Sequence, residues 1–156
     1  MSRISAVFAI AIAFVLDFAS KRLFAGHPDW NEQTWLPGLL DTHYAWNRGV
    51  SFSLFWQDGD LGSRVLAALL FLVTLIFAVA AFRTAKPLLA AAMGLIVGGA
   101  LGNMADRALH GAVFDFLVVR LGVHPFFVCN VADIFISLGV LLFFADTLLA
   151  PQKQPA

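Results

Sequence analysis

Two aspartates of this chain have strongly apolar neighbours and could act together as an acid and a base. Asp115 is flanked by phenylalanines in the segment 111–116, and Asp133 stands at the start of a long apolar stretch. Two carboxyl groups that lie close together cannot both ionise easily, so one of them keeps a proton. One carboxylate would then activate water while its protonated partner polarises a carbonyl oxygen, as in aspartic proteases. Asp133 also has a structural explanation, because an acid in a helix's first turn suits the helix dipole.

A second acid stands beside a base near the N-terminus. Asp17 and Lys21 are four residues apart in an apolar stretch, so they share one face of a helix. Charge near a bilayer is costly, and an ionisable residue there is often functional. The spacing equally suits a local ion pair in which Lys21 extends to the membrane interface. Both explanations remain open at this point.

A third polar cluster consists of Asn103, Asp106 and Arg107. It follows a stretch in which glycine recurs at four-residue intervals, at Gly94, Gly98 and Gly102. Small residues on one helix face allow another helix backbone to approach closely. A solvated helix end would explain the polar cluster, but an amide, an acid and a base together favour a site.

Other chemistries have less support. Ser51 and Ser53 lie near His43, but no nucleophile-elbow pattern surrounds them. No spacing of histidine, cysteine and acid matches a metal-ligand set, so we expect no metal site. The single cysteine, Cys129, cannot form a disulfide within the chain.

The composition indicates that membrane helices position these residues. Of the 156 residues, 60% are hydrophobic and 13% charged, and the mean hydropathy is +0.84. Soluble domains are about 45–50% apolar and about 25% charged. These values exclude a disordered chain, a disulfide-rich secreted scaffold and an ordinary soluble nucleotide-binding domain. Acidic and basic residues balance, so nothing indicates nucleic-acid binding.

We expect one domain over residues 1–156, an all-α membrane protein with four spans. A bilayer span needs roughly 20 apolar residues, and the predicted spans are about 4–24, 65–83, 88–105 and 131–149. The loops at about 25–62 and 106–130 then share the side opposite the termini. Basic residues divide almost evenly between the two sides, and we favour cytoplasmic termini. A cleaved signal peptide is the alternative for the first span, but residues 17–22 make a poor cleavage site.

The first long loop carries all four tryptophans, at positions 30, 35, 46 and 56. Tryptophan favours the membrane interface. Residues 43–47 and 51–55 alternate in part between polar and apolar types around Arg48 and Gly49. This pattern predicts short strands or a hairpin on the bilayer surface.

Five motifs in order along the chain resemble lipoprotein signal peptidases, the bacterial type II signal peptidases. The resemblance covers nearly the whole chain, and its most specific motif is Gly98-Gly99-Ala100-Leu101-Gly102-Asn103-Met104-Ala105-Asp106-Arg107. The other four are Asp17 with Lys21, the segment 47–53 (Asn47-Arg48-Gly49-Val50-Ser51-Phe52-Ser53), the segment 111–116 and Asn130-Val131-Ala132-Asp133.

The resemblance implies an intramembrane aspartic protease of the bacterial inner membrane, with its site at the outer face. It would remove the signal peptide from diacylglyceryl-modified prolipoproteins, cutting before the lipidated cysteine, without metal or organic cofactor. It implies inhibition by globomycin, a monomer, a surface β-cradle in the first loop and a small outer helix after Asp115. Asp115 and Asp133 would be the catalytic dyad. The residues implied to bind substrate or support the site are Asp17, Lys21, Asn47, Gly49, Asn103, Asp106, Arg107, Asn130 and Ala132.

Three positions depart from the family pattern: Phe18, Cys129 and Ile134 stand where members usually carry glutamine, phenylalanine and a small or polar residue. None removes a catalytic atom, so they bear on substrate preference and inhibitor response. The alternatives are an inactive relative that binds lipoprotein precursors, a small four-helix transporter and a purely structural membrane protein. A transporter would carry its ionisable residues near the bilayer midplane, whereas these crowd one interface.

Overall fold

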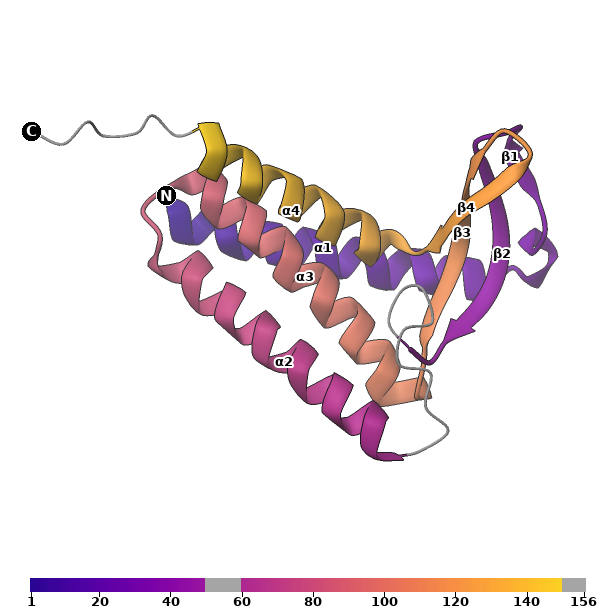
Figure 1. Cartoon of the computed structure of the whole chain (residues 1–156), viewed down its shortest axis with the longest axis horizontal. Helices are drawn as coiled ribbons and strands as arrows, with labels where there is room; N and C mark the ends of the chain where they lie inside the picture. The colour runs from indigo at the N-terminus through magenta and orange to yellow at the C-terminus, as the bar shows by residue number, and fades with distance from the viewer. Residues whose placement is uncertain (50–59, 150–156) are drawn as a thin grey trace, which may run out of the picture.

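The computed structural model describes residues 1–49 and 60–149 and contains a helical bundle with a small sheet at one end (Figure 1). The elements are α1 (Ser2–Ala25), the 3-10 helix η1 (Pro28–Trp30), β1 (Thr34–Leu36), β2 (Leu40–Asn47), α2 (Asp60–Arg83), α3 (Pro87–His110), β3 (Val113–Leu121), β4 (His124–Cys129) and α4 (Val131–Leu149). The start of α1, the end of α4 and the α2–α3 connection lie together at the end opposite the sheet.

Three of the helices are long and apolar enough to cross a membrane: Ser2–Ala25, Pro87–His110 and Val131–Leu148. The apolar part of α2, Ala67–Arg83, is shorter. The outward faces of the helices carry many exposed leucine, valine, isoleucine and phenylalanine side chains, which suit contact with lipid rather than water.

Small residues allow α3 to pack in the middle of the bundle. A methyl group at Gly94 would lie 2.8 Å from the Ala6 carbonyl oxygen of α1. On another face of α3, a methyl group at Gly99 would lie 2.6 Å from the Ala132 carbonyl oxygen of α4. The backbones of three helices therefore approach closely within one chain, so the glycine stripe packs helices inside this molecule.

The sheet is antiparallel with the strand order β1-β2-β3-β4. Asn47 pairs with Val113 and Ala45 with Asp115, so the end of β2 lies beside the start of β3. The predicted strand at residues 43–47 is part of β2, whose partners are β1 and β3. Residues 51–55 lie outside the described part of the chain.

Two predictions about the second outer loop are wrong. The chain after Asp115 forms no small outer helix within residues 113–129, because β3 and β4 pair there as a hairpin. Gly122, with a φ of 64°, allows the tight turn between them. In addition, α3 continues past the predicted end at residue 105 to His110, where Gly111 ends it in a left-handed conformation. Asp106 and Arg107 are therefore helical residues.

Candidate active site

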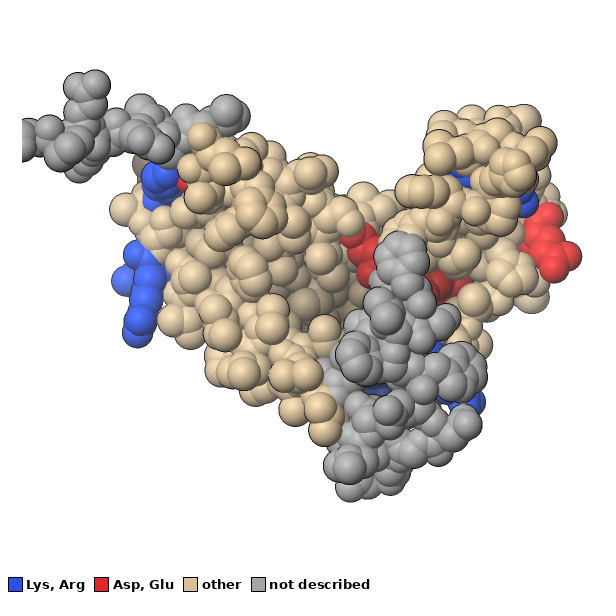
Figure 2. All heavy atoms as spheres, in the orientation of Figure 1, with Lys and Arg blue, Asp and Glu red and all other residues tan. Residues whose placement is uncertain are grey.

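Asp115 and Asp133 line the same hollow, which lies where the helices meet the sheet and measures about 200 Å³. Strand β3 positions Asp115, which is 4% exposed, and the first turn of α4 positions Asp133, which is half-buried. Figure 2 shows acidic side chains within the cleft between the bundle and the sheet, and basic ones at the opposite end of the bundle.

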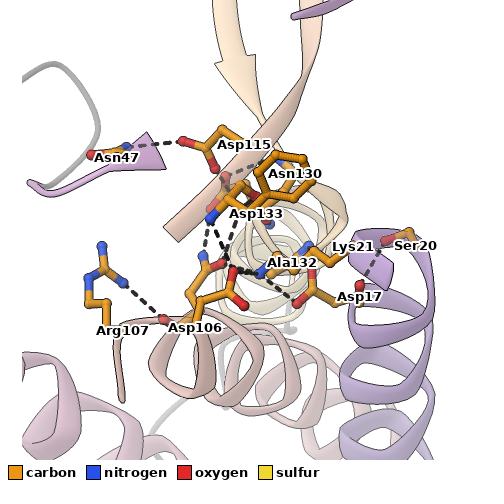
Figure 3. Close-up of polar contacts among 12 residues, drawn as sticks. Asp17, Ser20, Lys21, Asn47, Asp106, Arg107, Asp115, Asn130, Ala132 and Asp133 are labelled. Atoms are coloured by element: carbon orange, nitrogen blue, oxygen red, sulfur yellow. Dashed lines mark hydrogen bonds and ion pairs between the residues drawn. The ribbon is translucent and has the colours of Figure 1, made fainter. Parts of the chain in front are cut away.

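Asn130 joins the two aspartates. Its side-chain amide donates to Asp115 Oδ1 at 2.6 Å, and its Oδ1 accepts from the Asp133 N–H at 3.1 Å. Its own backbone N–H donates to Asp133 Oδ2 at 3.2 Å. Asn130 is fully buried between β4 and α4, so one residue fixes both carboxyl groups (Figure 3).

Two further asparagines complete the hydrogen bonding of the carboxyl groups. Asn47, at the end of β2, donates to Asp115 Oδ2 at 3.1 Å, and its own Oδ1 accepts from the Gly49 N–H. Asn103, on α3, donates to Asp133 Oδ1 at 2.9 Å. Each carboxyl oxygen of the pair thus accepts a hydrogen bond from the protein.

Arg107 brings a positive charge to the hollow. One guanidinium nitrogen donates to the Gly49 carbonyl oxygen at 3.0 Å and another to the Asn103 carbonyl oxygen at 3.3 Å. The side chain lines the hollow beside both aspartates. A guanidinium here can donate to a substrate carbonyl and offset the charge of the carboxylate that ionises.

Lys21 lies behind the aspartates and joins α1 to α3. Its ammonium is 2.8 Å from Asp17 Oδ2 and 2.9 Å from Asp106 Oδ2. The local ion pair expected for Asp17 is present, but Lys21 is buried in the polar network around Asp133 and not exposed; a role for Asp17 at a site stays a prediction. Asp17 also accepts from the Ala132 N–H at 2.8 Å.

The setting of Asp115 favours a protonated carboxyl group. Burial raises the pKa of Asp115 to about 6, and the nearby Asp133 carboxylate adds to the rise. Hydrogen bonds from Asn47 and Asn130 oppose it. Burial also raises the pKa of the Cys129 thiol to about 12, so this thiol stays neutral and is no nucleophile at neutral pH.

All of the predicted site residues lie in this one network, and their individual roles stay predictions. The hollow also has an apolar wall that was not predicted from the sequence, formed by Leu70, Ala100, Met104, Val113 and Ile136. These residues are apolar members of an apolar chain, so no signal in the sequence distinguished them. Of the three departures from the family pattern, Phe18 and Ile134 are about half exposed and Cys129 is buried, and none of them lines the hollow.

The same fold occurs in solved bacterial membrane enzymes. One such structure, described as a bacterial membrane enzyme solved by the in meso method at 1.9 Å, matches with a TM-score of 0.70 and 25% sequence identity. The match covers 97% of this chain and 94% of that one. The fold is therefore one that a membrane enzyme uses.

Sequence comparisons identify the family. The family model described as signal peptidase (SPase) II matches residues 9–149. The lipoprotein signal peptidase of Methylorubrum extorquens (strain PA1) is 42% identical over 154 residues, covering 97% of this chain and 90% of the relative. That of Caulobacter vibrioides is 37% identical, covering 92% and 86%. The chain belongs to the signal peptidase II family and is a multi-pass membrane protease.

Proposed function

We propose that this chain is an intramembrane aspartic endopeptidase that removes the signal peptide from diacylglyceryl-modified prolipoproteins. It cuts the peptide bond before the lipidated cysteine. The observation that carries the proposal is the pair of aspartates, Asp115 and Asp133, which line one hollow and share Asn130 in a chain of the signal peptidase II family.

The unlike settings of the two aspartates support a division of roles. Asp133 stands in the first turn of α4, where the helix dipole favours a negative charge, whereas Asp115 stands on a strand. Asp133 is then the base that takes a proton from water as the water oxygen attacks the scissile carbonyl carbon. Asp115 is the acid that donates its proton to the carbonyl oxygen.

The second half of the reaction returns both protons. Asp133 gives its proton to the amide nitrogen as the carbon–nitrogen bond breaks, and Asp115 regains a proton from the hydroxyl that becomes the new carboxyl group. No charge leaves the pair. Closing the hollow around the peptide excludes bulk water, which keeps the shared proton in place.

Hydrogen bonding separates substrate contacts from support. Arg107 lines the hollow, donates to backbone carbonyl oxygens and would hold substrate backbone. Asn47, Asn103 and Asn130 donate their side-chain amides to the two carboxyl groups, so we assign them to orienting the dyad. The apolar wall, including Leu70, Met104 and Ile136, would take the diacylglyceryl group.

We also propose how the chain sits in the membrane. It acts as one domain over residues 1–156, with α2 as a fourth span, both termini in the cytoplasm and the sheet at the outer face of the inner membrane. The sheet corresponds to the family's surface β-cradle. It acts as a monomer, and a globomycin-type inhibitor would occupy the same hollow. No metal or organic cofactor takes part in these steps.

The test is cleavage of a diacylglyceryl-modified prolipoprotein by the purified protein in bicelles. We expect Asp115→Asn and Asp133→Asn each to lower kcat by at least about 100-fold, because each removes an acid–base partner. Asp29→Asn, a change of the same kind at an exposed residue of η1, should cleave like the wild type. Signal-peptide loss followed on a gel reports all three.

Two outcomes would contradict the proposal. Activity that persists in either folded dyad variant would place the chemistry elsewhere. A folded wild type that binds several lipidated precursors and cuts none would instead indicate an inactive relative.

A further inference from the structure

Three charged side chains next to the dyad, two of them buried and one half-buried, take no part in the proposed proton transfers. They are Asp17, Lys21 and Asp106, whose side chains are 1%, 7% and 14% exposed. A lysine ammonium has three hydrogens to donate. That of Lys21 has three acceptors in contact: one oxygen of each carboxylate and Asn103 Oδ1 at 3.0 Å.

Both carboxylates hold the backbone immediately before a dyad aspartate. Asp17 Oδ1 accepts from the N–H of Ala132, the residue before Asp133, at 2.8 Å. Asp106 Oδ2 accepts from the N–H of Phe114, the residue before Asp115, at 3.1 Å. The ammonium of Lys21 therefore connects α4 and β3 at the two points from which the dyad side chains project.

The third contact orients an amide. Because Asn103 Oδ1 accepts from the ammonium, its amide nitrogen must face Asp133, to which it donates at 2.9 Å. A reversed amide would place an N–H against the ammonium and an oxygen against a carboxylate, and both contacts would be repulsive. Lys21, together with the Asn130 amide that donates to the same oxygen at 3.1 Å, thus fixes the direction of the hydrogen bond to Asp133.

We propose that Lys21 is a positioning residue that sets the separation and orientation of Asp115 and Asp133 through Asp17, Asp106 and Asn103. This inference rests on the proposed function for its chemistry and on the contacts above for its geometry. Lys21 is not among the residues that line the hollow of the dyad, so its effect on the reaction is indirect.

A role in stability alone is the competing explanation, and the variants must separate the two. Lys21→Met leaves two buried carboxylates uncompensated, which by itself destabilises a fold. The triple variant Lys21→Met/Asp17→Asn/Asp106→Asn removes all three charges, while each asparagine keeps an oxygen that can accept the backbone N–H. The control is Lys86→Met, which breaks a 2.7 Å ion pair with Asp146 at the far end of the bundle.

Steady-state kinetics on a lipidated prolipoprotein give the first readout. We expect the triple variant to lose at least about 10-fold in kcat with KM within about two-fold of the wild type, because a displacement of about 1 Å in reacting groups costs up to about 100-fold in rate. Lys86→Met should match the wild type in both constants. Thermal unfolding of each variant confirms that folded protein is compared.

Hydrogen exchange gives a second readout that needs no cleavage. The amides of Phe114 and Ala132 belong to segments far apart in the sequence, yet both depend on Lys21 in this proposal. In Lys21→Met and in the triple variant we expect both amides to exchange at least about 10-fold faster than in the wild type. Lys86→Met should leave both unchanged.

The two readouts separate failure of this inference from failure of the proposed function. A folded triple variant with wild-type kcat and wild-type exchange at both amides would overturn the positioning role and leave the protease intact. A wild type that cuts no lipidated substrate would overturn the proposed function. The exchange rates of the Phe114 and Ala132 amides would then be the only test of the positioning role.

Discussion

The asparagine side chains that donate hydrogen bonds to Asp115 and Asp133 are each fixed in one orientation. Asn47 and Asn130 each accept a backbone N–H through Oδ1, so their amide nitrogens must face Asp115. Lys21 and the Asn130 amide fix Asn103 in the same way, because both donate to its Oδ1. An amide side chain that could turn over would sometimes present its oxygen to a carboxylate, and the pair would lose a defined protonation pattern.

The pH dependence of cleavage follows from the acid role that we propose for Asp115. Its raised pKa of about 6 means that the free enzyme loses the required proton as the pH rises through that value. We therefore expect kcat/KM, which reports the free enzyme, to fall on the alkaline side with an apparent pKa near 6 that belongs to the pair. Initial rates between pH 4.5 and 8.5 measure it, and a flat profile to pH 8 would contradict the assignment.

Sequence motifs could identify the polar side chains of this site but not all of their partners. The dyad, the asparagines and Arg107 stand in recognisable patterns of residue type and spacing. The contact between Asp17 and the Ala132 N–H joins residues 115 positions apart, and a backbone donor leaves no trace in the residue type. The same holds for Asp106 and the Phe114 N–H.

At the scale of elements, helix α3 determines how closely the bundle packs. The sequence correctly predicted its small-residue face, but it left open whether that face packs within one chain or between two. The predicted end of α3 lay too early in the chain, because polar residues mark where a helix leaves the membrane and not where the helix ends. The hairpin after Asp115 was missed because its apolar run does not alternate clearly, and pairing with β2 determined its structure.

Gly102 lies on α3 where this helix packs closely against α1, beside the candidate site. A methyl group there would overlap the buried carboxylate of Asp17, so Gly102→Ala must displace the side chain that holds Ala132. We expect a loss of about 1–3 kcal/mol in stability, measured by thermal unfolding in detergent, together with lower kcat.

The matched control is Gly26→Ala. Gly26 has a φ of −78°, which any residue adopts, and a methyl group there meets only the carbonyl oxygens of its own last turn, at 3.3 Å or more. It should unfold and cleave like the wild type. Equal losses in both variants would indicate that the lost glycine, and not the displaced Asp17, causes the effect.

At the scale of the whole molecule, the polar site lies between an apolar bundle and a sheet. Charged side chains occur at two levels, one at the sheet and one at the opposite end, where Arg3, Arg83 and Lys86 are exposed. The apolar length of the helices separates them. A lipid-anchored substrate can then keep its acyl chains in the bilayer while its peptide reaches the hollow.

Cysteine labelling tests the proposed orientation. His43 and Lys86 lie at opposite ends, with side chains 54% and 53% exposed, whereas the native Cys129 is buried. We expect a membrane-impermeant maleimide to label His43→Cys in intact spheroplasts and Lys86→Cys only in inverted vesicles. The unsubstituted chain should stay unlabelled in both, and the reverse pattern would invert the topology.

The four-residue spacing of Asp17 and Lys21 also matters while the protein is being made. As α1 enters the bilayer, its acid and base already lie one turn apart and neutralise each other before any later helix exists. Asp106 is synthesised two helices later and then meets an ammonium already in place. The order of synthesis thus matches the order of charge compensation, because Asp17 has its partner before α2, α3 and α4 are made.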